Sequence, residues 1–112
     1  MSAAARRGRL VVGNWKMNGS RASNAVLLDE LKRAAPFAVA VAVCAPMPYL
    51  ADVGAALQGT TIAWGAQDCS SHDAGAFTGE VSAAMLAEFG CRFVIVGHSE
   101  RRALHGESDR LV

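Results

Sequence analysis

A buried strand that runs into a polar turn is most clearly visible in Phe93-Val-Ile-Val-Gly-His-Ser-Glu-Arg-Arg102. Its apolar, β-branched half does not alternate with charged residues, which is typical of a strand buried on both faces of a parallel sheet. Three earlier runs share this character, namely Leu10-Val-Val12, Val39-Ala-Val-Ala-Val43 and Thr61-Ile-Ala-Trp64. We therefore predict four buried strands.

Helix-like stretches separate these strands. Residues 22–35 carry apolar side chains at helical spacing and stop at Pro36. Residues 49–58 and 82–89 each end at a glycine, which commonly follows the last turn of a helix. The resulting β-α-β-α-β-α-β order predicts an α/β fold, in which right-handed crossovers build a parallel sheet covered by outer helices.

Composition describes a folded chain with no strong electrostatic field. Its 112 residues are 52% hydrophobic and 19% charged, which indicates one globular domain. The opening segment is basic, so we expect a flexible tail over residues 1–8 and the domain over residues 9–112. A net charge of +1 argues against a nucleic-acid partner. The longest nearly apolar run, residues 34–45, is far shorter than the roughly 20 residues that span a bilayer. The three cysteines are an odd number at unrelated spacings and imply no complete set of disulfides, which fits a reducing cytoplasm.

Polar residues follow the predicted strands where parallel α/β sheets collect their working groups. Asn14 and Lys16 follow the first strand, two residues apart, so an amide and an ammonium could converge on one small anion. His98 follows the fourth strand, where a helix begins, and a neutral imidazole there could exchange a proton with a carbonyl oxygen. Two plainer interpretations stay open, a solvated turn at Lys16 and a helix entry at His98 capped by Ser99.

Two other motifs carry alternatives. Gly97-His-Ser-Glu-Arg101 comes close to the nucleophile elbow of a serine hydrolase, which would make Ser99 a nucleophile, although Arg101 stands where a glycine is expected. Cys69 and His72 have the spacing of half a zinc site, but no second pair completes it, so we expect no metal. The long polar loop 67–79 carries Phe77 between glycines, which indicates docking on another surface. The plainer interpretation, a mobile loop whose aromatic side chain packs against its own base, stays open.

Three segments, taken in order, closely resemble the triosephosphate isomerase family. They are Gly13-Asn-Trp-Lys-Met-Asn-Gly19, Gly65-Ala-Gln67 with Gly75-Ala-Phe-Thr-Gly-Glu80, and Val94-Ile-Val-Gly-His-Ser-Glu-Arg-Arg102. The resemblance runs from about Arg9 to Val112. It implies the first four βα units of a (β/α)8 barrel that interconverts dihydroxyacetone phosphate and glyceraldehyde 3-phosphate in glycolysis and gluconeogenesis, without metal or organic cofactor.

The resemblance also implies roles for individual residues. Asn14 and Lys16 would bind the substrate, and His98 would polarise its carbonyl and move a proton between its two oxygens. Glu100 would hold Lys16 in place or assist proton movement, while Ser99 would support the catalytic base from outside the substrate contacts. The 67–79 loop would dock on the partner of a homodimer, with Thr78 reaching the partner's site and Phe77 filling the contact.

Length sets a further expectation. A barrel of this family needs roughly 250 residues, so the general-base glutamate, the lid and the phosphate grip would lie outside these 112 residues. We therefore expect the 112 residues alone to be inactive as an isomerase. A chain of this length that is complete in itself would expose two sheet edges, so a self-associating, non-catalytic half-barrel is the remaining alternative.

Overall fold

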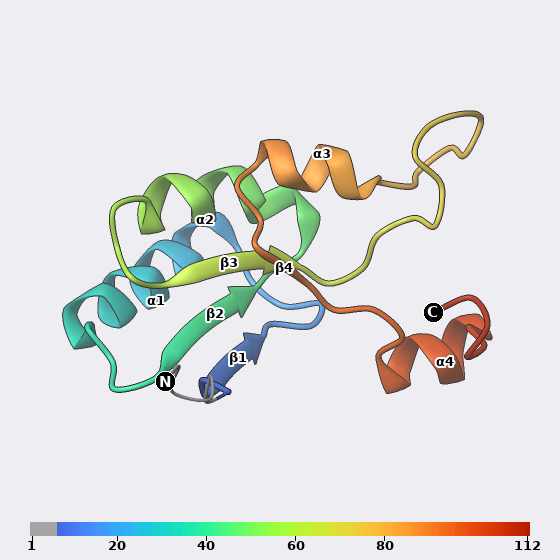
Figure 1. Cartoon of the computed structure of the whole chain (residues 1–112). Helices are drawn as coiled ribbons and strands as arrows, with labels where there is room; N and C mark the ends of the chain where they lie inside the picture. Colours follow the sequence, from blue (N-terminus) through green and yellow to red (C-terminus); the bar gives the residue numbers. More distant parts are fainter. Residues whose placement is uncertain (1–6) are drawn as a thin grey trace, which may run out of the picture.

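The computed structural model describes residues 7–112, so most of the expected tail, residues 1–8, lies outside the described part of the chain. Strands and helices alternate along the chain as the sequence predicts (Figure 1). The strands are β1 Leu10–Asn14, β2 Ala40–Cys44, β3 Ala63–Ala66 and β4 Phe93–Val94. The helices are α1 Arg21–Ala34, η1 Met47–Tyr49, α2 Leu50–Leu57, α3 Ala83–Glu88 and α4 Ser99–His105.

The four strands form one parallel sheet whose spatial order, β1-β2-β3-β4, follows the chain. Helices α1, α2 and α3 lie along one side of this sheet, whereas α4 follows β4 beyond the end of the strands (Figure 1). Parallel neighbours joined through helices are the repeating βα unit of an eight-stranded barrel. The predicted fold class, a run of four βα units, is confirmed.

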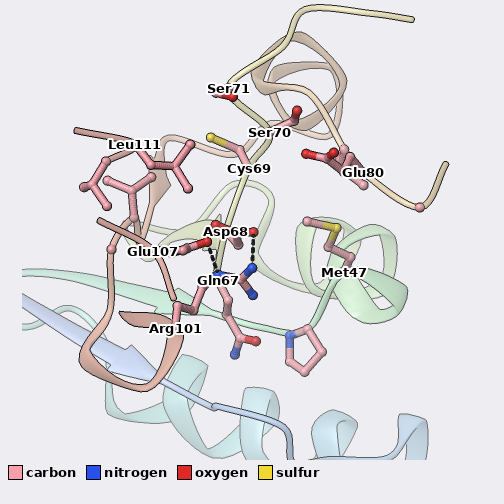
Figure 2. Close-up of a pocket in the computed structure, with 16 residues that line it drawn as sticks. Met47, Gln67, Asp68, Cys69, Ser70, Ser71, Glu80, Arg101, Glu107 and Leu111 are labelled. Atoms are coloured by element: carbon pink, nitrogen blue, oxygen red, sulfur yellow. Dashed lines mark hydrogen bonds and ion pairs between the residues drawn. The ribbon is translucent and has the colours of Figure 1, made fainter. Parts of the chain in front are cut away.

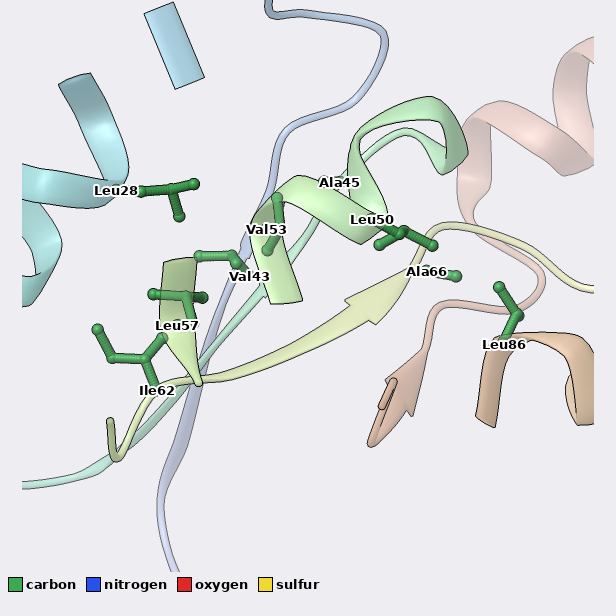
Figure 3. Close-up of a cluster of buried hydrophobic side chains, with 9 residues drawn as sticks. All are labelled: Leu28, Val43, Ala45, Leu50, Val53, Leu57, Ile62, Ala66 and Leu86. Atoms are coloured by element: carbon green, nitrogen blue, oxygen red, sulfur yellow. The ribbon is translucent and has the colours of Figure 1, made fainter. Parts of the chain in front are cut away.

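The hydrophobic core lies between the sheet and the helices (Figure 3). Val53 and Leu57 of α2 are fully buried against β2 and β3, and Leu28 and Leu86 close the cluster from α1 and α3. Within residues 7–112, β1 is less well covered than this core, because the side chains of Leu10, Val11 and Val12 are 43%, 56% and 40% exposed. The described residues therefore pack the helical side of the sheet and leave much of β1 accessible.

Several element boundaries differ from the prediction. β3 begins at Ala63 instead of Thr61, and β4 covers Phe93–Val94 instead of Phe93 to Val96. The backbone N–H of Ile95 still donates to the carbonyl of Ala66, but the chain then turns at Gly97, whose φ is +59°. This left-handed conformation favours glycine and leads the chain out of the sheet toward α4.

Close contact between β3 and β4 depends on a glycine. A Cβ atom added to Gly65 would lie 2.1 Å from the carbonyl oxygen of Phe93, so any other side chain would clash with the neighbouring backbone.

Among the described residues, none of the helices combines the length and the apolar composition that a membrane crossing requires.

Candidate active site

The carboxyl ends of the strands gather the polar residues at one rim. Asn14 is the last residue of β1, Gln67 follows β3 directly, and His98 stands just before α4. All strands run in the same direction, so these ends meet at the same edge of the sheet. The structure thus brings together segments that are far apart in the sequence.

Lys16 and Glu100 connect the first and last of these segments. The ammonium Nζ of Lys16 lies 2.6 Å from Oε1 of Glu100, and the two side chains are 53% and 48% exposed. Both side chains remain open to solvent at the rim. An exposed pair of this kind adds little stability, so its main effect is to hold the Lys16 ammonium in place at the rim.

Asn14 is held from two sides. Its side-chain oxygen Oδ1 accepts a hydrogen bond from the backbone N–H of Lys16 at 2.9 Å and another from Nε2 of Gln67 at 3.2 Å. The predicted substrate residues Asn14 and Lys16 therefore share one tight turn. Lys16 itself has a φ of +55°, which is uncommon for a residue other than glycine.

His98 caps helix α4 with its imidazole. Nδ1 accepts the backbone N–H of Glu100 at 3.0 Å, so in this arrangement Nδ1 carries no proton and Nε2 carries the N–H of the neutral ring. The side chain is 26% exposed, so Nε2 is free to act as a donor at the rim. The plainer interpretation is partly correct, since His98 does begin the helix, but the cap is His98 and not Ser99.

The carboxylate of Glu100 is kept ionised by its neighbours. The hydrogen bond from Lys16 holds the pKa of Glu100 below its ordinary value, with a smaller opposing contribution from burial. Oε2 of Glu100 also lies 3.6 Å from Nδ1 of His98. Glu100 therefore contacts both predicted catalytic neighbours, and the sequence could not show this distance.

The depressed pKa of Glu100 predicts a pH dependence of stability. A carboxyl group whose pKa is lowered by folding stabilises the folded state above its unfolded pKa, near 4.5, and this contribution is lost as the pH falls through the lowered folded value. We expect Glu100→Gln to lower the free energy of unfolding at pH 7, and the difference from the parent to vanish in acid. Urea titrations from pH 7 down to pH 3 measure this.

Glu30→Gln on α1 is the control, because Glu30 is exposed and forms no ion pair within residues 7–112. A Glu100→Gln difference that stays constant across the pH range would contradict the assignment of the Lys16 contact as its source.

A cavity of about 650 Å³ lies beside the polar rim (Figure 2). Its wall includes Gln67, but Asn14, Lys16 and His98 do not line it. Arg101 donates toward Glu107 at 2.9 Å and lies 3.2 Å from Asp68. Burial raises the pKa of Asp68, while Arg101 acts in the opposite direction. One guanidinium thus pairs with two partly buried carboxylates.

The loop 67–79 projects from the body of the molecule between β3 and α3 (Figure 1). It contains no helix or strand, as its composition predicts. Phe77 is 38% exposed and stacks on His72, with ring centroids 3.7 Å apart. Thr78 beside it is exposed. The aromatic side chain therefore packs within its own loop and keeps part of its surface accessible.

Gln67 is a rim residue that the sequence interpretation did not include in the site. Its Nε2 donates to Asn14 and to the backbone carbonyls of Lys16 and Cys44. Its position directly after a strand, in the segment Gly65-Ala-Gln67, was the signal in the sequence that could have identified it.

Ser99 is exposed at the start of α4. Nδ1 of His98 accepts a hydrogen bond from the backbone N–H of Glu100 and not from the hydroxyl of Ser99.

Comparison with known proteins identifies the family. A family model described as triosephosphate isomerase matches residues 9–112. Proteins named triosephosphate isomerase from Bordetella pertussis and Thiobacillus denitrificans are both 63% identical to this chain, over 100% and 95% of its length. A third, from Nitrosococcus oceani, is 60% identical over 92% of the chain. The chain spans only 42–46% of the length of these relatives.

These matches overturn two alternatives. The serine hydrolase built on Ser99 is wrong, because residues 9–112, which include the motif around Ser99, match the triosephosphate isomerase family model. The non-catalytic half-barrel is wrong as well, since the relatives that cover the whole chain are named as enzymes. A parallel βα sheet, a polar rim made of the ends of β1, β3 and β4, and a match over residues 9–112 have one common explanation. The chain belongs to the triosephosphate isomerase family.

Proposed function

We propose that these residues supply the amino-terminal part of the active site of a triosephosphate isomerase, an enzyme that interconverts dihydroxyacetone phosphate and glyceraldehyde 3-phosphate. The observation that carries the proposal is the rim cluster, in which Glu100 contacts both Lys16 and His98. A cation, a neutral imidazole and an amide donor suit a substrate that combines a phosphate with a carbonyl group.

Each residue has a defined part in the proposed reaction. The Lys16 ammonium offsets the charge of the phosphate and of the enediolate that forms when a proton leaves the substrate carbon. Nε2–H of His98 donates to the carbonyl oxygen, and the ring transfers a proton between the two oxygens of the enediolate. Asn14 binds the substrate with the donor end of its amide. Glu100 keeps Lys16 in place, and Ser99 supports the catalytic base.

A hybrid enzyme tests this proposal. Residues 1–112 replace the matched part of the Bordetella pertussis triosephosphate isomerase, to which they are 63% identical. We expect this hybrid to isomerise glyceraldehyde 3-phosphate, as measured with a coupled dehydrogenase assay. A folded hybrid with no activity, beside an active unmodified Bordetella enzyme, would overturn the proposal.

The 112 residues alone are expected to be inactive. By family resemblance, the general-base glutamate belongs to the part of the relatives that this chain does not match, and a missing general base costs about 10²–10⁴ in rate. The same coupled assay measures this on the 112-residue chain. Activity equal to that of the hybrid would show that the base lies within these residues.

We also propose that the full-length enzyme is a homodimer. The exposed Phe77 and Thr78 on the projecting loop are suited to docking on a second subunit, with Thr78 reaching the partner's Asn14. Sedimentation of the hybrid carrying Phe77→Ser tests this, and Leu27→Ser on α1, of similar exposure at 40%, is the matched control. Equal dimerisation of both variants would contradict the docking role of the loop.

We also propose a cytoplasmic location, which the three free cysteines fit.

A further inference from the structure

The side-chain amide of Gln67 connects three strand ends at the rim. Nε2 lies 2.8 Å from the backbone carbonyl oxygen of Lys16, 3.1 Å from that of Cys44 and 3.2 Å from Oδ1 of Asn14. An amide nitrogen has only two protons for these three acceptors, so at least one proton is shared. All three partners are oxygens, which leaves only one sensible orientation of the Gln67 amide.

This contact also fixes the orientation of Asn14. Oδ1 of Asn14 accepts from Gln67 and from the backbone N–H of Lys16, so its two acceptor positions are both used inside the protein. The Asn14 amide group therefore cannot flip without losing two hydrogen bonds. Its Nδ2 has no acceptor within residues 7–112 and remains available as a donor for a ligand.

Hydrogen bonds on both sides of Lys16 hold its backbone in a strained conformation. A left-handed φ is strained for a residue that carries a side chain, and it persists only where the surroundings impose it. The N–H of Lys16 donates to Asn14, and its carbonyl accepts from Gln67. Gln67 thus acts on the turn directly, and also through Asn14.

We infer that Gln67 is a positioning residue for triose phosphate binding, which presents the donor end of Asn14 to the substrate and holds the turn that directs Lys16 to it. The inference rests on the proposed function. Gln67 needs no contact with the substrate, because it acts through the two residues that would bind it. Loss of its amide should therefore weaken substrate binding beyond any effect on stability.

Gln67→Met in the hybrid is the first test, since it keeps the length of the side chain and removes the donor. We expect kcat/KM to fall by about 10–100-fold, mainly through a higher KM, when it is assayed well below the melting temperature. Gln58→Met is the matched control, because Gln58 is exposed at the end of α2. Unchanged kinetics beside a lowered melting temperature would reduce Gln67 to a structural role and overturn the inference.

Gln67→Glu is the second test and covers the case in which the methionine variant does not fold. An ionised carboxylate would face three oxygens and repel them, whereas the protonated acid can still donate one hydrogen bond. Activity of this variant should decline as the pH rises through the pKa of the new carboxyl group, in a limb that the parent lacks. A pH profile identical to that of the parent would contradict the inference.

Amide hydrogen exchange of Lys16 provides a readout that needs no substrate. We expect this amide to exchange faster in Gln67→Met than in the parent, and at the parental rate in Gln58→Met. An inactive hybrid with this pattern would count against the proposed function and leave the positioning role supported. Unchanged exchange in Gln67→Met would overturn the positioning role even in an active hybrid.

Discussion

Replacing His98 with glutamine in the hybrid is expected to lower kcat/KM by about 10²–10⁴-fold, the usual contribution of a group that transfers protons in the transition state. Glutamine can cap α4 with its carbonyl oxygen and donate through its amide, but it cannot take up and release a proton at neutral pH. The fall should therefore appear in kcat while the helix cap is retained. Steady-state kinetics with glyceraldehyde 3-phosphate measure both constants.

His105→Gln is the control for this experiment. It changes the same residue type at the other end of α4, where the side chain is exposed and away from the strand ends. We expect its kinetics to match the parent within about twofold, because a surface substitution away from the site changes little. A similar loss in both variants, or none in His98→Gln, would contradict the role proposed for His98.

Replacing Arg101 with methionine is expected to lower the free energy of unfolding by about 2 kcal/mol at pH 7. Removal of one partner of a fully buried ion pair costs more, and the partial exposure of this cluster reduces the loss. The Arg101 side chain is 32% exposed, whereas that of Glu107 is 13% exposed. The variant leaves Asp68 and Glu107 without their cation. Urea unfolding of the 112-residue chain measures the difference.

Acid should weaken this effect. Burial already raises the pKa of Asp68 with Arg101 present, so ionised Asp68 is disfavoured in the folded state and stability is gained as the pH falls. In Arg101→Met the Asp68 carboxyl group takes up a proton more readily, because the cation that lowers its pKa is gone, and the loss in stability should shrink toward low pH. Arg33→Met is the control, because Arg33 is 78% exposed and pairs with Asp29 at 3.4 Å. An equal loss in both variants would contradict the cluster's role.

The order of the strands and helices could be predicted from the sequence because it depends on local patterns. Uniform β-branched runs such as Val39-Ala-Val-Ala-Val43 mark buried parallel strands, and Pro36 and Gly90 mark where helices stop. The sequence also predicted that the polar residues after β1 and β4 meet, because parallel strands end at the same edge of a sheet. The quoted motifs around Asn14 and His98 added the family.

Boundaries depended on the tertiary structure. β4 is short because the chain leaves the sheet at Gly97, and a pattern of apolar residues contains no record of that turn. His98 caps α4 in place of Ser99 for a similar reason. Both residue types can accept a backbone N–H, and only the path of the chain selects which one does.

The sequence by itself determined the class of fold, the family, and which strand ends carry Asn14, Lys16 and His98, because each of these depends on residue types at fixed local spacing. The family resemblance already paired Glu100 with Lys16, but only the tertiary structure decided the contact geometry and the partners of Gln67. Glu100 lies against Lys16 although 84 positions separate them in the sequence, and Gln67, which follows β3, binds the ends of both β1 and β2. Such contacts depend on how crossovers place distant backbone atoms within a few ångströms of each other, and no local pattern encodes that distance.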